Sequence, residues 1–135
     1  MRPTLRRICR TVVVTLTLVL LLAVIVFVRY NVDWPMRYEL PAGYRGWVIV
    51  KYEDPTCPPM RSQGFYWVIR ISPGGRACTS SETLHGWTYH RLEYVDPDGT
   101  RAVAPGRLIS YGNKGGLLFI GTEEELRDSW RTVPR

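Results

Sequence analysis

The first third of the chain is dominated by one uninterrupted apolar run, residues 11–28. The run carries no charged residue, and its polar side chains are three threonines. As a helix it would extend about 27 Å at roughly 1.5 Å per residue, which matches the hydrocarbon core of a bilayer. A helix also satisfies its own backbone hydrogen bonds, as a lipid environment requires. The pattern therefore predicts a transmembrane helix over residues 11–28, with the lipid bilayer as its partner.

The charges on either side of this run predict its orientation. Uncompensated arginines precede it, whereas the residues that follow it, up to residue 39, are close to neutral. The side richer in Arg and Lys usually stays in the cytoplasm. We therefore expect residues 1–10 in the cytoplasm, the C-terminal part outside the inner (cell) membrane, and Tyr30 and Trp34 at the outer membrane interface. The charged residues are Arg2, Arg6, Arg7 and Arg10 before the run, and Arg29, Asp33, Arg37 and Glu39 after it.

A cleaved signal peptide is the alternative interpretation of this run. The hydrophobic part of a signal peptide is usually about 7 to 15 residues long and is followed by small residues at the cleavage site. Here the run is longer, it ends in the bulky sequence Val26-Phe27-Val28, and no cysteine follows closely to receive a lipid. We therefore expect an uncleaved single-pass anchor.

Beyond the anchor, the sequence predicts a tether and then one small β domain. Residues 29–42 contain two prolines and several charges, which favour a partly extended tether. From residue 43 to residue 135, short apolar stretches alternate with glycine- and proline-rich turns, as in hairpin-connected strands. The expected strands cover residues 44–52, 65–71, 76–80, 87–95, 100–104, 107–111 and 117–120, and residues 53–64 are expected to form a loop.

The end of the chain changes from strand to helix periodicity. Thr122 followed by Glu123-Glu124-Glu125 is a capping box, and Leu126 and Trp130 would then lie on one helix face. Several short strands followed by one helix indicate a mainly β fold. We expect a small antiparallel β-sandwich or open barrel with a short C-terminal helix.

The distribution of charge excludes one class of partner. The formal net charge is +6, but residues 1–39 account for four of these positive charges. The remaining 96 residues carry twelve basic and ten acidic side chains, without a basic run interleaved with aromatic residues. Such a run is the usual signature of a nucleic-acid-binding domain, so we expect no nucleic acid partner.

The three cysteines are separated by the predicted topology. Cys9 lies on the cytoplasmic side, where thiols stay reduced, whereas Cys57 and Cys78 lie outside. A disulfide between them would close a loop of about 20 residues and contribute on the order of 3 kcal/mol in the loop-entropy model. Two unpaired thiols are the alternative.

Reactive side chains gather in one region, but their spacing matches no catalytic motif. His85 and His90 are five residues apart and would lie on opposite faces of a continuous strand. No paired C-x-x-C, H-E-x-x-H, G-x-S-x-G or phosphate-binding glycine motif is present. We therefore expect no catalytic, metal-binding or cofactor-binding residue and no enzymatic activity. The region comprises Cys78, Ser80, Ser81, Glu82, His85, His90 and Glu93.

Several short motifs resemble a family of small bacterial domains of unknown function. The main block runs from Pro41-Ala42-Gly43-Tyr44 through Gly46-Trp47, then Tyr52, Asp54-Pro55 and Cys57-Pro58-Pro59. Thr79-Ser80-Ser81, Gly86-Trp87 and Gly121-Thr122 with the following glutamates extend the resemblance over roughly residues 40–126. Members often follow a signal or lipoprotein segment, so the resemblance implies export. It implies no activity.

These features favour a protein-interaction module held in the bacterial envelope. The anchor, the small β domain and its many aromatic residues fit a partner-binding role, including that of an immunity protein or inhibitor. One alternative is a small envelope hydrolase or metalloenzyme that uses the His85 and His90 region. Another is a structural subunit of a membrane assembly.

Overall fold

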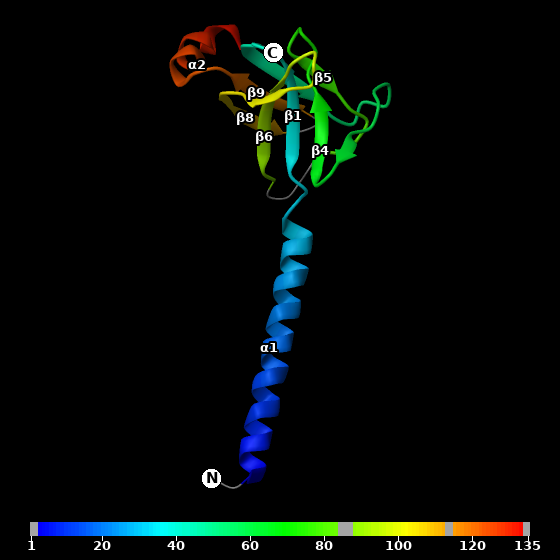
Figure 1. Cartoon of the computed structure of the whole chain (residues 1–135), viewed down its shortest axis with the longest axis vertical. Coiled ribbons are helices and arrows are strands. Elements are labelled where there is room, and N and C mark those ends of the chain that lie inside the picture. The colour runs from blue at the N-terminus through cyan, green and yellow to red at the C-terminus, as the bar shows by residue number, and fades with distance from the viewer. Residues whose placement is uncertain (1–2, 84–87, 113–114, 134–135) are drawn as a thin grey trace. The chain divides into compact units, whose positions relative to one another are not determined.

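The protein consists of an N-terminal helix and a β domain (Figure 1). The structure, a computed structural model, describes residues 3–83, 88–112 and 115–133. Its contacts divide the chain into one unit that contains residues 1–33 and another that contains residues 34–84 and 88–135. Each unit is described by itself below.

Helix α1 (Pro3–Asn31) contains the predicted span. Its segment Arg6–Asn31 is long and apolar enough to cross a membrane, and the most apolar 18-residue window of this segment has a mean hydropathy of 3.1. The hydroxyls of Thr11, Thr15 and Thr17 each donate a hydrogen bond to the carbonyl four residues earlier. These bonds satisfy the polar groups within the helix, as an apolar surrounding requires.

The second unit contains two mixed β-sheets that share one core. The five-stranded sheet has the order β3-β4-β1-β6-β7, and the four-stranded sheet has the order β5-β2-β9-β8. The first comprises β1 (Met36–Pro41), β3 (Arg61–Gln63), β4 (Tyr66–Arg70), β6 (His90–Val95) and β7 (Arg101–Val103). The second comprises β2 (Gly46–Lys51), β5 (Arg76–Cys78), β8 (Gly106–Gly112) and β9 (Gly115–Ile120).

Residues 36–41, predicted as part of the tether, instead form the central strand of the five-stranded sheet. Strand β1 pairs in parallel with β4 on one side and β6 on the other, as the neighbouring ribbons in Figure 1 show. Its alternation explains this position: Met36, Tyr38 and Leu40 are almost fully buried, whereas Arg37 and Glu39 point to the opposite face. Pro35 precedes the strand and Pro41 is its last residue, so neither proline interrupts it.

The mainly β fold class is confirmed, with no closed barrel, but the sheets are not purely antiparallel. Besides the parallel pairs of β1, strand β2 pairs in parallel with β5. The core draws side chains from both sheets, which makes the domain a sandwich. Its most deeply buried large side chains are Met36, Tyr38, Leu40, Val48, Val50, Tyr52, Leu118 and Ile120.

The remaining predicted elements correspond to strands or to the final helix. The exception is β3, a short edge strand within residues predicted as loop. Helix α2 (Glu123–Ser129) begins at the predicted capping box, in which Thr122 and Glu125 exchange side-chain and backbone hydrogen bonds. Leu126 is buried, whereas Trp130 lies in the 3-10 helix η1 (Trp130–Thr132) and contacts Trp47.

Candidate functional site

Strand alternation places a group of arginines and glutamates on the face of the five-stranded sheet opposite the core. In the register of β1 and β6, Arg37 lies beside Arg91 and Glu39 lies beside Glu93. The flanking strands β4 and β7 add one further arginine each. We call this group the arginine face; it consists of Arg37, Glu39, Arg70, Arg91, Glu93 and Arg101.

The two glutamates of the arginine face are buried beneath the arginines. Glu39 and Glu93 are 5% and 4% exposed. Glu39 accepts from Arg70 Nε at 2.9 Å and lies 2.7 Å from Arg101 Nη2. Glu93 pairs with Arg91, with Arg101 Nη1 at 3.1 Å and with Arg37 Nε at 3.5 Å. Arg101 therefore bridges both carboxylates.

The surrounding cations keep Glu93 ionised. Burial by itself would raise the pKa of Glu93, but hydrogen bonds from Arg101 and Arg91 and the charge of Arg37 hold the pKa below its ordinary value. Hydrogen bonds to Glu39 and Glu93 raise the pKa of Arg101. An ionised carboxylate held by several guanidinium groups is a poor proton donor, so this geometry does not provide a general acid.

The arginine face carries more positive than negative charge. Four guanidinium groups face two carboxylates, and the side chains of Arg70 and Arg91 are 80% and 41% exposed. Arg37 lies over the Tyr66 ring, 4.2 Å from its centroid, in a cation–π contact. Guanidinium groups form planar, bidentate hydrogen bonds with carboxylates and phosphates. The arginine face can therefore bind an acidic group.

The described residues of the predicted reactive region do not form a common site. His90 points to the core, where its ring stacks on Tyr38 and its Nδ1 lies 3.2 Å from the Tyr38 hydroxyl. Burial lowers the pKa of His90. Glu93, three residues further along β6, points to the opposite face of the sheet. His85 lies outside the described residues.

The other described members of the predicted reactive region do not form a reactive group either. Cys78 is bonded to Cys57, so it is not a free nucleophile. Ser81 Oγ accepts a hydrogen bond from the Met60 backbone at 2.9 Å. Ser80 is half-buried and Glu82 is exposed. Among residues 3–83, 88–112 and 115–133, no three potential metal ligands lie together.

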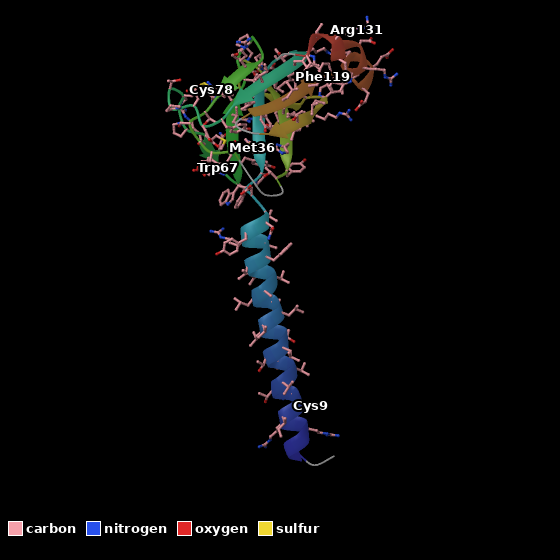
Figure 2. The ribbon with its side chains drawn as sticks, turned by 180° about the vertical axis from the view of Figure 1, so that it is seen from behind. Cys9, Met36, Trp67, Cys78, Phe119 and Arg131 are labelled. Carbon is pink, nitrogen blue, oxygen red and sulfur yellow. A yellow bond between two sulfur atoms is a disulfide. The ribbon has the colours of Figure 1, made fainter. Side chains whose placement is uncertain are left out.

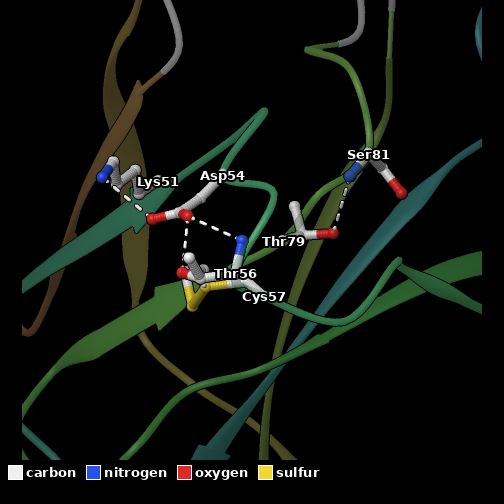
Figure 3. Close-up of a disulfide and its surroundings, with 7 residues drawn as sticks. Lys51, Asp54, Thr56, Cys57, Thr79 and Ser81 are labelled. Atoms are coloured by element: carbon white, nitrogen blue, oxygen red, sulfur yellow. Dashed lines mark hydrogen bonds and ion pairs between the residues drawn. A yellow bond between two sulfur atoms is a disulfide. The ribbon is translucent and has the colours of Figure 1, made fainter.

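The predicted disulfide between Cys57 and Cys78 is present (Figure 3). It joins the loop after β2 to the end of β5. In the same loop, Asp54 accepts hydrogen bonds from the Thr56 hydroxyl and backbone and pairs with Lys51 at 2.9 Å. These hydrogen bonds, that of the Thr56 hydroxyl first, hold the pKa of Asp54 far below its ordinary value. The loop is thus fixed by covalent and polar contacts.

The two residues predicted at the membrane interface are exposed. Tyr30 in α1 is 84% exposed, and Trp34, the first residue of the β domain, is 47% exposed. The Trp34 ring also contacts Phe65 and Trp67 of the same domain.

The arginine face was missed in the sequence, although a signal is present. Strands β1 and β6 contain the similar segments Arg37-Tyr38-Glu39 and Arg91-Leu92-Glu93, each an R-x-E triplet. In a strand, the first and third residue of such a triplet share one face. Two such triplets indicate a charged face, but which strands lie side by side is set by the topology.

Comparison with known proteins identifies a family of unknown function and a similar fold. Comparison with curated proteins finds no match. The crystal structure titled "Putative Lipoprotein from Bacillus anthracis" has a similar fold, with 19% sequence identity, a TM-score of 0.56, and coverage of 78% of this chain and 83% of that chain. The DUF6843 family of unknown function matches residues 34–132, which include β1 and the whole arginine face. Because this match covers most of the sequence, the chain belongs to the DUF6843 family of unknown function.

Proposed function

We propose that this protein is a single-pass, membrane-anchored envelope protein whose β domain binds an acidic surface of a partner protein through the arginine face. The observation that carries the proposal is the arrangement of Glu39 and Glu93, which are almost fully buried beneath a surplus of partly exposed arginines. The proposed role is recognition without catalysis.

The energetics of the arginine face favour a recognition role over a purely stabilising one. Burying ion pairs costs several kcal/mol of desolvation per ion, and apolar residues of similar size often give equal or greater stability. The buried carboxylates nevertheless fix the positions of Arg37 and Arg101, whose side chains are only 16% and 32% exposed. A guanidinium group that is already fixed loses less conformational entropy when it binds an acidic group.

The location of the protein is inferred from its N-terminal helix. Helix α1 is long and apolar enough to span a bilayer, and the arginines near its N-terminus favour a cytoplasmic N-terminus. The disulfide fits an oxidising compartment on the other side. The similar fold of the Bacillus anthracis protein, which is named as a lipoprotein, supports an exported β domain.

Photo-cross-linking of the full-length protein in membranes of its native host tests the proposed contact. Val103 lies beside Glu93 in the sheet register and is 73% exposed, so a photoreactive amino acid at this position would report a bound partner. We expect one cross-linked protein. Arg70→Glu should reduce its yield about tenfold, which corresponds to roughly 1.4 kcal/mol of binding free energy.

Arg107→Glu is the matched control. Arg107 is also an exposed arginine, with its side chain 57% accessible and paired with Glu123, but it belongs to the four-stranded sheet. This change alters the net charge as Arg70→Glu does, so it should leave the cross-linked yield unchanged. The absence of a discrete cross-linked protein, or equal yields from both variants, would refute the proposal.

A further inference from the structure

Three exposed aromatic residues lie at the edge of the five-stranded sheet where β1 begins. Met36, the first residue of β1, is in register with Trp67 in β4 and with His90 in β6. Figure 2 shows Met36 and Trp67 close together in the β domain. Trp34, Phe65 and Tyr89 come one or two residues before these paired positions, so their backbones share this edge. We call these three residues the aromatic edge.

The aromatic edge is exposed despite its apolar character. Phe65 is 79% exposed, Tyr89 is 65% exposed and Trp34 is 47% exposed. The Trp34 ring centroid lies 6.4 Å from that of Phe65, so at least these two rings form one patch. Gly64 and Thr88, which precede Phe65 and Tyr89, carry no charge. Exposed apolar residues that gather in one place usually mark an interaction surface.

The length of chain that joins this edge to α1 indicates what covers it. Helix α1 ends at Asn31, so Val32 and Asp33 alone separate it from Trp34. Three residue steps of fully extended chain reach about 10 Å. The headgroup region on one side of a bilayer is roughly 5 to 8 Å thick. Trp34 is therefore held near the headgroups if α1 spans the membrane, whatever the orientation of the β domain.

We propose that the aromatic edge docks the β domain onto the headgroup region of the bilayer that α1 spans. Aromatic rings, those of Trp and Tyr above all, favour this region because it accommodates an apolar ring beside polar groups. Docking would also place Phe65 and Tyr89, which are far from the anchor in sequence, in the headgroup region. The inference rests on the proposed membrane anchoring of α1, and it adds a second, reversible membrane contact made by the folded domain.

Spin-label accessibility in full-length protein reconstituted alone into phosphatidylcholine liposomes tests this docking. Single labels are placed by Phe65→Cys or by Pro97→Cys, with Cys9→Ser in both proteins and the Cys57–Cys78 disulfide intact. Pro97 is the matched control, because it is an exposed turn residue beyond the other end of β6. Collisions of each label with oxygen, which enters lipid, are compared with collisions with a water-soluble nickel chelate.

We expect the ratio of oxygen to nickel collisions at residue 65 to be severalfold higher than at residue 97. Adding Trp34→Ser should lower the ratio at residue 65 toward that at residue 97. Equal ratios at the two sites would overturn the docking proposal, as would a label at residue 65 shielded from both reagents, which indicates contact with another protein chain.

A third label, placed by Leu20→Cys in α1, separates this outcome from failure of the anchoring itself. An oxygen-rich environment at residue 20 with an aqueous residue 65 would refute docking and leave the anchor intact. An aqueous environment at residue 20 would refute the membrane span, and with it the docking that depends on it.

Discussion

Glu39 and Glu93 depend on their arginine partners more than any other described acidic residues do. Both are at most 5% exposed, whereas the other ion-paired carboxylates, such as Glu123 at 68%, are more accessible to water. A buried charge without its partner is costly, because protein atoms replace water poorly. The network therefore constrains which single substitutions the β domain tolerates.

Glu93→Gln should strongly destabilise the domain at neutral pH. The amide keeps the shape of the side chain but leaves Arg91, Arg101 and Arg37 without their shared carboxylate. Breaking a buried pair costs about 3 to 5 kcal/mol. Urea denaturation of the full-length protein in detergent, followed by tryptophan fluorescence, would measure the loss. Glu123→Gln on the surface is the control, with an expected change below about 1 kcal/mol.

The stability difference between the unaltered protein and Glu93→Gln should also depend on pH. The pKa of Glu93 is lower in the folded protein than its ordinary value of 4.5, so its ionisation stabilises the fold fully above about pH 4.5. That contribution is lost as pH falls through the lower folded-state pKa. The stability difference between the unaltered protein and Glu93→Gln should therefore shrink on acidification. A constant difference down to pH 2 would contradict the ion-pair assignment.

At the level of elements, the sequence predicted those elements whose structure depends on contacts between residues close together in the chain. Thr122 and Glu125 predict the start of α2 because a capping box is a contact between residues three apart. The tether prediction for residues 36–41 was wrong for the opposite reason. In the sequence, two prolines and alternating charges resemble a linker. The segment is a strand because β4 and β6 pair with it on both sides. Parallel partners far along the chain leave no local signal.

The disulfide gives a quantitative prediction for the loop after β2. Replacing both Cys57 and Cys78 by serine should lower stability by about 3 kcal/mol, because the unfolded chain regains the freedom of a loop of roughly 20 residues. Differential scanning fluorimetry of the full-length protein would show a fall in Tm of more than about 10 °C. Cys9→Ser, which removes a thiol that forms no disulfide, should leave the Tm unchanged.

At the scale of the whole molecule, the boundary of the β domain differs from the predicted one. The sequence patterns placed its start at residue 43, whereas the compact unit and the family match both begin at residue 34. The arginine face depends on the earlier start of the domain, because Arg37 and Glu39 lie in β1, which the predicted domain did not include. The sequence alone therefore predicted the fold class and the disulfide but missed the surface assembled by β1.

Two fragments test this boundary. Residues 34–135 should give a soluble domain with a cooperative thermal transition. Residues 43–135 should not fold, because they lack Met36, Tyr38 and Leu40, and removing buried side chains of this size costs roughly 2 to 5 kcal/mol each. For the three residues together the loss is about 6 to 15 kcal/mol, which is as large as the whole stability of a small domain, about 5 to 15 kcal/mol. Near-UV circular dichroism, followed during heating, would show whether each fragment unfolds cooperatively. Cooperative unfolding of residues 43–135 would contradict the central role of β1.

The position of β1 also has a consequence for the order of folding. In the proposed topology, β1 is the first strand to leave the membrane, yet its partners begin at Tyr66 and His90, long after it in the chain. Until these segments have been translocated, β1 exposes two open strand edges together with its apolar side chains. Pairing over such sequence separations is slow. The nascent domain therefore passes through a stage in which its membrane-proximal strand is available to any other extended chain, and export stalled before His90 would prolong that stage.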